Sequence, residues 1–329
     1  MTTQSNIQQD SLSYNDPQDR AMEVQPKTWL ESFVSGPWPW LVPAILMLIV
    51  FRLYPLLSQF YISLTDMRIA TINDPNFIGL DNYIFLLSDS GFIGTIFFTF
   101  IYTIVGVLGQ FVIGFGLALL LNQPMFGRLI FRLAIVSAWV ISSLIVGYMW
   151  RLMLSESSAG VLNSWLNLIG IDSINWLSHI DTAKISVIAV NIWRSVAFSM
   201  VFVLGGLQTV PHEMLEAAKV DGANALQRLF FIVIPYLRAL IALNLIFVTI
   251  STFNVYEQVL VLTGGGPGTS TETIGLSMYK TAFGSSIGTG GLGLLGRGAA
   301  VGTVMFMITL VFALIYLRLW IFNNKDDRS

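Results

Sequence analysis

The sequence contains no cysteine, and only 11% of its 329 residues are charged. The absence of cysteine excludes disulfides, thiolate metal sites and cysteine nucleophiles. A soluble domain carries about 25% charged residues, so most of this chain is not built to face water. The net charge of −2 gives no support for nucleic-acid binding. The G-x-x-x-x-G-K-[ST] pattern is also missing, which excludes a P-loop ATPase within this chain.

Long apolar runs take the place of the missing charge, since 54% of the residues are hydrophobic. A helix that crosses a bilayer needs about 20 mostly apolar residues. Only helices and closed barrels satisfy every backbone polar group in lipid, and continuous runs without alternation favour helices. We therefore predict an all-α membrane protein with six transmembrane helices. The six runs are residues 40–62, 95–121, 130–153, 184–207, 236–262 and 299–322.

The first 37 residues differ from the rest. Residues 1–20 are rich in Gln, Asn, Ser and Asp, a composition typical of disorder, and they lack the early apolar run of a cleavable signal peptide. Trp29, Trp38 and Trp40 suit an entry at the membrane interface. The predicted organisation is a cytoplasmic tail and interface entry over 1–37, a six-helix domain over 38–323, and a second cytoplasmic tail over 324–329.

The distribution of the 17 Lys and Arg residues predicts the orientation. With the N-terminus inside, the inner segments hold a moderate excess of them, as expected for cytoplasmic loops. His179 and His212 then lie on opposite sides of the membrane and cannot share a metal. Arg52 lies within the first span, three residues before Pro55. It is either a functional intramembrane charge or a side chain that caps carbonyls freed by the proline or snorkels to the interface.

A polar island, Pro-His-Glu-Met-Leu-Glu-Ala-Ala-Lys-Val-Asp-Gly-Ala over residues 211–223, separates the fourth and fifth runs. It resembles the cytoplasmic coupling loop of importer-type ABC permeases, whose pattern is Glu-Ala-Ala, three residues, Gly, nine residues and Ile-x-Leu-Pro. Gly222 and Pro235 fall in register with that pattern, and Ile234 replaces the Leu. The resemblance implies a cytoplasmic coupling helix between the fourth and fifth transmembrane helices.

Local chemistry supports a short helix in this island. Thr209 can cap it, with Pro211 in its first turn, where a missing N–H costs nothing. Gly222 can adopt a positive φ and turn the chain into a second helix, and Pro235 is expected to mark the start of the next span. The residues that the resemblance assigns to contact with an ATPase are Glu213, Glu216, Ala217, Ala218, Asp221 and Gly222.

Other stretches narrow the resemblance to sugar-type permeases, the class that includes the larger membrane subunit of the maltose transporter. Phe-Ile-Gly-Leu-Asp-Asn-Tyr over 77–83 and Leu-Thr-Gly-Gly-Gly-Pro over 262–267 look like two loop elements of that class, and Asn191-x-Trp193 lies where its helix before the coupling loop begins. The resemblance implies a subunit of a carbohydrate importer that works by alternating access in the bacterial inner membrane. The resemblance also implies that the chain is not an enzyme and carries no cofactor or catalytic residue of its own.

The same resemblance implies partners. These are a second homologous permease subunit in a heterodimer, two cytoplasmic ABC ATPase subunits that use ATP and Mg, and an extracytoplasmic solute-binding protein. Membrane lipid surrounds the chain, and no nucleic acid is expected. The solute-binding residues that it implies are Arg194, Ser195, Phe198, Phe253, Asn254 and Glu257.

Polar stripes on the fourth and fifth runs agree with a solute path. Asn191, Ser195 and Ser199 recur every four residues and share one helix face, and Asn244, Ser251, Asn254 and Gln258 form a looser stripe. Such stripes normally face the bundle interior, although hydrogen bonds between helices explain them equally well. Because a charge facing lipid is costly, we predict that Arg194 and Glu257 flank one polar cavity.

Two alternatives remain. The importer could carry an amino acid, a phosphoester or a compatible solute, or the chain could be a multi-span membrane enzyme with catalytic groups gathered at one depth. The sequence shows no such cluster. The G-x-G-x-x-G match at 291–296 lies outside the strand–turn–helix context that nucleotide binding needs. We expect a Gly-rich outer loop over 284–298 and short interfacial helices over 80–87 and 161–166.

Overall fold

The structure, a computed structural model, describes residues 38–157, 160–284 and 293–323. The expected tails over 1–37 and 324–329 lie outside these residues. Within the described ranges the chain is helical, with no strand and one isolated antiparallel bridge between Thr65 and Phe77. The chain divides into two units, Met1–Leu57 and Ser58–Ser329.

The described part of the first unit is one apolar helical segment. It consists of α2 (Trp38–Leu48), a π-helical turn η2 (Ile49–Leu53) and the start of α3 (Tyr54–Ser63). Proline has no N–H to offer the helix, and a widened turn in which Tyr54 N–H bonds to the Ile49 carbonyl precedes Pro55. Arg52 lies in this widened turn.

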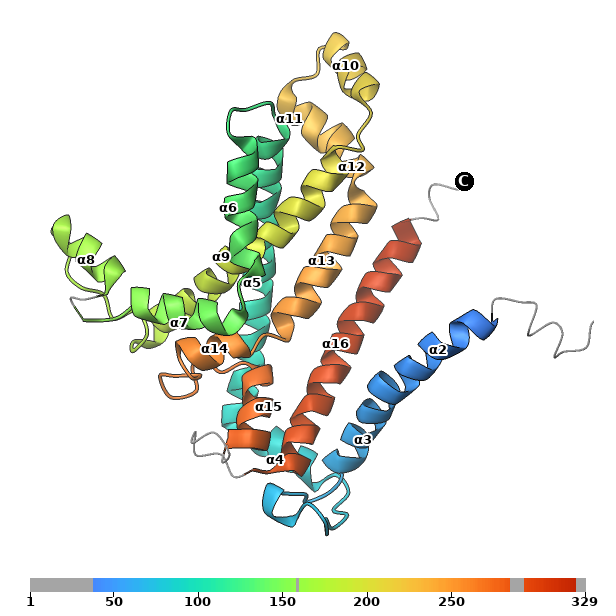
Figure 1. Cartoon of the computed structure of the whole chain (residues 1–329), viewed down its shortest axis with the longest axis vertical. Helices are drawn as coiled ribbons and strands as arrows, with labels where there is room; N and C mark the ends of the chain where they lie inside the picture. The colour runs from blue at the N-terminus through green and yellow to red at the C-terminus, as the bar shows by residue number, and fades with distance from the viewer. Residues whose placement is uncertain (1–37, 158–159, 285–292, 324–329) are drawn as a thin grey trace, which may run out of the picture. The chain divides into compact units, whose positions relative to one another are not determined.

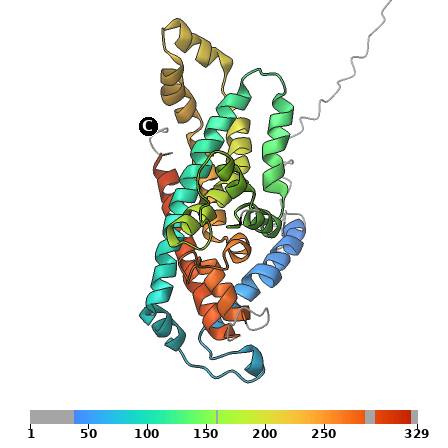
Figure 2. The same ribbon diagram turned by 90° about the vertical axis from the view of Figure 1, so that its left-hand side faces the viewer.

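The second unit carries the remaining helices (Figure 1). Its elements are η3 (Ile69–Thr71), α4 (Asp81–Ser88), α5 (Ser90–Asn122), α6 (Arg128–Val140), α7 (Ser143–Met153), α8 (Val161–Leu168), α9 (Ile180–Leu207), α10 (His212–Val220), α11 (Ala225–Arg228), η4 (Leu229–Val233), α12 (Ile234–Tyr236), α13 (Arg238–Phe253), α14 (Glu257–Leu262), α15 (Ile274–Phe283) and α16 (Leu295–Asn323). Within this unit, Figures 1 and 2 show α10 and α11 at one end and α4 and α15 at the other.

The long helices α5 and α9 pack against each other, and glycine permits their close approach. A Cβ on Gly114 would lie 2.7 Å from the Ser199 Cβ and 2.9 Å from the Met200 backbone nitrogen, so no larger residue fits there without movement. Small residues serve helix contacts in this way in membranes. The pair forms a frame for the other helices, with α6 and α13 packed against α9 and with α13 also against α5.

By length and composition, four helices could cross a membrane: Pro39–Ser63, Ser90–Asn122, Ile180–Leu207 and Leu295–Arg318. Two bent pairs raise the number to six if each pair is one span. The axes of α6 and α7 differ by 101°, and those of Ala225–Tyr236 and Arg238–Phe253 by 73°. The protein is therefore a multi-pass membrane protein with four to six apolar helical spans in its described residues.

The prediction that residues 130–153 and 236–262 form continuous helices is wrong. The first run breaks at Ile141 and Ser142, which are extended with ψ near 140°, where two successive serines can compete for backbone hydrogen bonds. The second run ends at Phe253, and a new helix starts at Glu257. Asn254 Nδ2 donates to the Ile250 carbonyl at 2.6 Å, a side-chain bond that ends the helix.

The short helices expected over 80–87 and 161–166 are confirmed as α4 and α8. The Gly-rich loop expected over 284–298 is only partly described, because 285–292 lie outside the described residues. Its end is not a loop, since α16 begins at Leu295, and Gly298 lies in its first turn, where a Cβ would be 2.7 Å from the Ala282 Cβ.

At the end opposite α10, a loop between α3 and α4 is closed by one acidic side chain. The Asp66 carboxylate accepts hydrogen bonds from the Asn76 backbone N–H at 2.7 Å and from the Asn76 Nδ2 at 3.1 Å. These bonds favour the ionised form and hold the pKa of the Asp66 carboxyl below its usual value.

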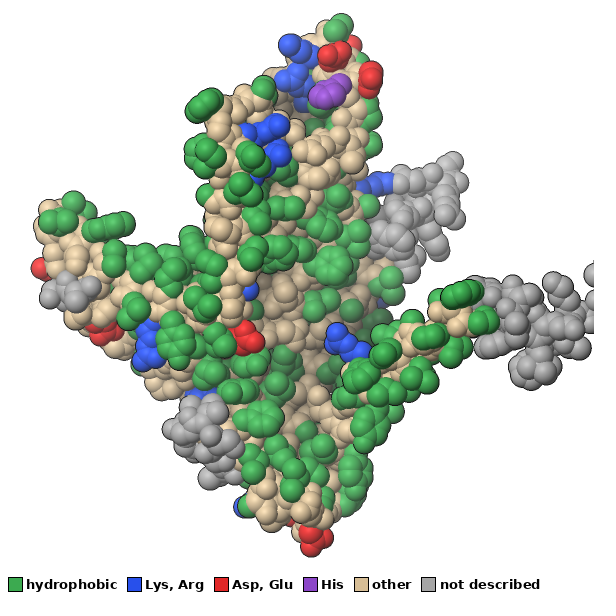
Figure 3. Space-filling model, viewed as in Figure 1, with side chains coloured by type: hydrophobic (Ala, Val, Ile, Leu, Met, Phe, Trp, Pro, Cys, Tyr) green, Lys and Arg blue, Asp and Glu red, His purple; other side chains and the backbone are tan. Residues whose placement is uncertain are grey.

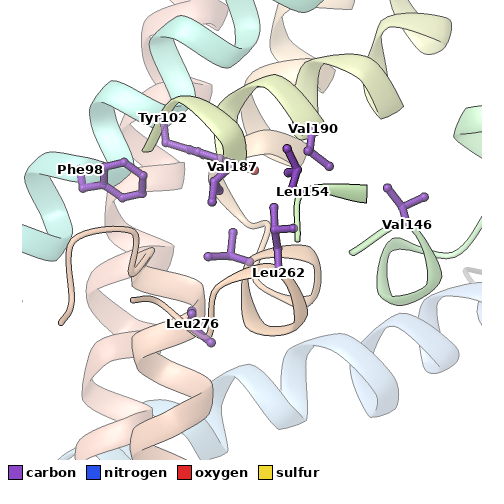
Figure 4. Close-up of a cluster of buried hydrophobic side chains, with 9 residues drawn as sticks. Phe98, Tyr102, Val146, Leu154, Val187, Val190, Leu262 and Leu276 are labelled. Atoms are coloured by element: carbon purple, nitrogen blue, oxygen red, sulfur yellow. The ribbon is translucent and has the colours of Figure 1, made fainter. Parts of the chain in front are cut away.

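One apolar cluster joins five helices of the second unit (Figure 4). Val146 and Leu154, from α7 and its end, meet Val187 and Val190 on α9 and Leu262 on α14. The two short helices that follow the breaks are thereby fixed to the α5–α9 frame, with Phe98 and Tyr102 on the α5 side and Leu276 on α15. Elsewhere, the flanks of the unit expose hydrophobic side chains (Figure 3), as expected of a surface that faces lipid.

Candidate functional site

A cavity of about 410 Å³ lies inside the second unit, beside the bend between α6 and α7 and the interruption between α13 and α14. Its walls come from α5, α6, α7, α9, α13 and α14, and from the segment between α13 and α14. Because irregular backbone at membrane depth is tolerated only inside protein or along a water-filled cavity, its position at both breaks is physically consistent. The lining residues are Gln110, Trp139, Ser143, Asn191, Arg194, Ser195, Phe198, Phe247, Val248, Ser251, Thr252, Asn254, Val255, Tyr256 and Glu257.

The structure brings most of the predicted solute-binding residues to this cavity: Arg194, Ser195, Phe198, Asn254 and Glu257 line it. Phe253 does not. Its side chain is fully buried in an apolar cluster, with its ring centroid 5.4 Å from that of Phe312 in a T-shaped contact. The binding role of the five residues stays a prediction.

Arg194 and Glu257 lie on the same cavity, as their depth along the chain predicts. In the described part of the chain Arg194 forms no ion pair with Glu257. Its Nε and Nη2 both donate to the Ile141 carbonyl, each at 3.4 Å. Arg194 therefore contacts the break between α6 and α7 as well as the cavity.

The polar stripes divide into two kinds of environment. Ser199 Oγ donates to Asn244 Oδ1 at 3.2 Å, a buried bond that joins α9 to α13 and has a packing role. Asn191 is 1% exposed and lines the cavity, and neither of its amide atoms has a hydrogen-bond partner among the described residues. A buried amide without partners is costly, so Asn191 is suited to bind a polar group that enters the cavity.

Sequence reasoning missed the contribution of α5 to the cavity. Gln110 is 1% exposed, and its Nε2 donates to Thr252 Oγ1 at 3.1 Å. The signal was present in the sequence, because Gln110 is the one amide in the interior of a 33-residue apolar helix. Trp139 and Ser143, which flank the break, were missed because the break itself was not predicted.

One wall of the cavity is aromatic. The Phe198 ring lies 5.8 Å from that of Trp139 and 6.4 Å from that of Phe247, centroid to centroid. Apolar ring faces beside polar amides and charged groups form a surface that can bind a ligand with both hydroxyl groups and C–H faces.

The predicted ATPase-contact residues lie on and just after α10, at one end of the second unit (Figure 1). This nine-residue helix buries none of its side chains, and charged side chains gather over this end (Figure 3). Of the predicted set, Ala218 is half-buried and the other members are exposed: Glu213, Glu216, Ala217, Asp221 and Gly222.

The C-terminus of α10 has the predicted glycine turn. Gly222 has φ +84°, its N–H bonds to the Lys219 carbonyl at 3.1 Å, and Ala223 N–H bonds to the Ala218 carbonyl at 2.9 Å. This pair of bonds is the Schellman motif, which satisfies carbonyls at a helix end. A capping box of Asn224 and Gln227 then starts α11.

Two expectations about the ends of this region are wrong. Thr209 does not cap α10, because its Oγ1 donates to the Gly206 carbonyl at 2.8 Å, and Pro211 occupies the N-cap position without a side-chain bond. Pro235 does not mark the start of the next helical segment, because it lies in α12 within the stretch Ala225–Tyr236, and α13 begins at Arg238 after the 73° bend.

Metal chemistry finds no support in the described residues, which contain no group of three or more His, Asp or Glu side chains able to hold an ion. The one ion pair with both partners described, Lys280 to Glu272 at 2.7 Å, lies near the end opposite α10. It stabilises the segment that leads into α15.

Comparison with known proteins gives a consistent result. Residues 110–324 match the family described as binding-protein-dependent transport system inner membrane component. The trehalose/maltose transport permease MalF of Thermococcus litoralis is 31% identical over 86% of this chain and 93% of its own. The sulfoquinovosyl glycerol transport permease SmoG of Agrobacterium fabrum is 32% identical over 87% and 90%.

Among solved structures, a chain of a bacterial alginate ABC transporter in complex with an alginate-pentasaccharide-bound periplasmic protein superposes with a TM-score of 0.74. The match covers 88% of this chain and 96% of that chain at 22% sequence identity. At this identity the likeness shows that the fold is shared.

Proposed function

Because the chain belongs to the family of binding-protein-dependent inner-membrane transport components, we propose that its central cavity is the solute site of a saccharide importer. The chain is the permease component of such an importer, and its relatives include permeases named for trehalose, maltose and sulfoquinovosyl glycerol transport. The observation that carries the assignment is the cavity at the two helix breaks, with amides, charges and an aromatic wall. The cargo is a sugar or a sugar-like solute.

The residues proposed to hold the solute have distinct roles. The rings of Phe198 and Trp139 would cover apolar sugar faces. Asn254 and Glu257, at the break after α13, and Ser195 on α9 would exchange hydrogen bonds with hydroxyl groups. Arg194 also lines this site. Phe253 is removed from the set because it is buried away from the cavity.

ATP hydrolysis in a partner chain would drive the transport. We propose that α10 is the coupling helix, docked on a cytoplasmic ABC ATPase that binds ATP and Mg, and that it connects to the cavity through α9 and through α11 to α13. Its exposed side chains and fixed C-terminal turn support this role. Two ATPase subunits, a second homologous permease subunit and an extracytoplasmic solute-binding protein would complete the importer.

The same proposal fixes the topology. If α10 is cytoplasmic, the end that carries α4 and α15 faces outward, where a solute-binding protein can reach it. Six spans then result if each bent pair crosses the membrane once, with both termini in the cytoplasm of a bacterium and the chain in its inner membrane.

ATP-dependent uptake by the complete importer in proteoliposomes tests the proposal. The panel holds trehalose, maltose, an amino acid, a phosphoester and a compatible solute. We expect uptake of a saccharide, reduced by Glu257→Gln. The control Asp181→Asn makes the same chemical change at an exposed position in the first turn of α9, away from the cavity, and should transport normally.

Other outcomes decide against the proposal in different ways. Uptake of a non-saccharide alone would replace the cargo and keep the importer. Equal uptake by both variants would remove Glu257 from the solute site. Hydrolysis or group transfer on a membrane substrate by the purified chain would favour a membrane enzyme.

A further inference from the structure

The break between α6 and α7 leaves a carbonyl without its helical partner. Ile141 and Ser142 are extended, with ψ of 138° and 141°, and the first bond of the new helix runs from Val146 N–H to the Ser142 carbonyl at 3.0 Å. The Ile141 carbonyl is thus excluded from both helices, although an uninterrupted helix would bond it to the N–H four residues later. In a membrane such a group needs another donor.

Arg194 supplies that donor from an unbroken helix. It lies at the middle of the 28-residue α9, and both Nε and Nη2 reach the Ile141 carbonyl at 3.4 Å. The Trp139 and Phe198 rings, 5.8 Å apart, pack the two helices together beside this contact. Since a guanidinium at this depth is costly when it faces lipid, its position on the break satisfies both partners.

The far arm of the bend is fixed separately. Arg151 Nη1 on α7 donates to the Val261 carbonyl on α14 at 3.3 Å. A Cβ on Gly147 would lie 3.0 Å from the Val261 Cβ, so these two short helices pack closely. The arm that follows one break is therefore attached to the helix that follows the other, and Ser143 and Glu257, which begin these helices, face the same cavity.

We propose that Arg194 is a positioning residue: by bonding to the Ile141 carbonyl it fixes the α6–α7 bend, and with it the shape of the cavity. This inference rests on the proposed transport function for its consequence, but the bend itself is measurable without transport. A direct contact between Arg194 and solute is the competing explanation. The two differ in the empty protein, where only a positioning residue affects the bend.

Distances between spin labels measure the bend. The chain has no cysteine, so Ile130→Cys and Leu152→Cys, at sites 71% and 73% exposed, label both arms cleanly. With 101° between the axes, helical rises of 1.5 Å per residue place the two backbone positions about 20 Å apart. A straight helix would place them about 33 Å apart. The measurement uses the complete importer in nanodiscs without solute.

The variants are chosen to keep side-chain volume. Arg194→Met removes the donors and retains a long stem, whereas Arg194→Lys retains one donor. The contact already made by Nε shows that the Ile141 carbonyl lies within reach of a side chain of lysine length. Lys184→Met removes a cation from the outer end of the same helix and serves as the matched control.

We expect Arg194→Met to add a population at longer distances and to raise the half-saturating solute concentration about tenfold, as for loss of one charged hydrogen bond. Arg194→Lys should keep the short distance, and Lys184→Met should match the unsubstituted protein. If Arg194→Met keeps the single short distance, the inference is overturned, even when uptake falls, because Arg194 then acts on the solute directly.

The proposal stays testable even if a variant fails to assemble into the importer. If Arg194→Met does not assemble, Arg194→Lys decides, and a broadened distribution in that variant contradicts the proposal. Failure of the unsubstituted importer to take up any solute would instead count against the proposed function, while the distance measurement would still test the role of Arg194 in the bend.

Discussion

Substitution of Gly222 tests whether the turn after α10 is needed for coupling. Its φ is +84°, a region in which a side chain strains the backbone, and a Cβ there would have no atom within 4 Å. The cost of a substitution is therefore backbone strain alone, about 1–2 kcal/mol for Ala. Asn tolerates this conformation and should cost less, and the β-branched Val should cost more.

The strain should appear as weaker docking of the ATPase if the docked form needs this turn. A cost of 1–2 kcal/mol corresponds to a factor of about 5–30 in an equilibrium constant. We expect the dissociation constant of the ATPase subunit for the permease in nanodiscs to rise about 5–30-fold for Gly222→Ala, more for Gly222→Val and least for Gly222→Asn. Uptake should fall in the same order.

A matched glycine controls for the loss of glycine itself. Gly205, in α9, also has open space around a built Cβ but lies in ordinary helical backbone, so Gly205→Ala should leave docking unchanged. Undiminished uptake and unchanged ATPase affinity in Gly222→Val would refute the reasoning, because the positive φ would then have no part in coupling.

Three further predictions follow from local geometry. Gly114→Ala should lower the thermal stability of the purified protein, because overpacking costs about 1–3 kcal/mol. The control Gly116→Ala, whose Cβ meets nothing within 4 Å, should leave the stability unchanged. Equal melting temperatures of the two variants would contradict the close packing of α5 and α9. Lys219→Cys should react with a membrane-impermeant maleimide only from the cytoplasm and Thr269→Cys only from outside, and the reverse pattern would overturn the topology. In the folded protein the pKa of the Asp66 carboxyl lies below its value in the unfolded chain. The stability that Asp66 gives its loop is therefore present above the unfolded pKa and is lost as the pH falls through the folded pKa. Hydrogen exchange should show this loop opening at acid pH in the unsubstituted protein, and a loop whose opening does not depend on pH would contradict the prediction.

The apolar runs predicted which segments are helical but not where helices break. The fourth run, predicted over 184–207, is a helix over Ile180–Leu207, and it contains neither a proline nor two successive serines. Hydropathy averages over a window and cannot detect the break at Ile141 and Ser142. The local signal is a pair of serines inside an apolar run, which is too common to predict a 101° bend.

The site was predictable to the extent that it depends on single helices. Arg194 and Ser195 are adjacent in the unbroken α9, Phe198 follows about one turn later, and all three line the cavity. Phe253 failed because it lies at the last residue of α13, where neighbouring residues point about 100° apart around the axis. Asn254 therefore faces the cavity while Phe253 packs against Phe312. Gln110 carried a local signal, as the one amide in the interior of α5, but its place in the cavity wall depends on tertiary packing.

Helix breaks and intramembrane polar groups have a common physical cause in this chain. A break frees backbone groups that lipid cannot satisfy, so it must lie inside the protein, and a cavity for a hydroxyl-rich solute needs unsatisfied polar groups at the same depth. Placing both breaks around one cavity meets the two requirements together. Asn191, whose amide has no partner among the described residues, then offers that amide to the cavity, whereas Ser199 Oγ donates to Asn244 Oδ1 and so joins α9 to α13. We therefore expect contact with the solute from those polar groups that lie beside a break and have no hydrogen-bond partner among the described residues.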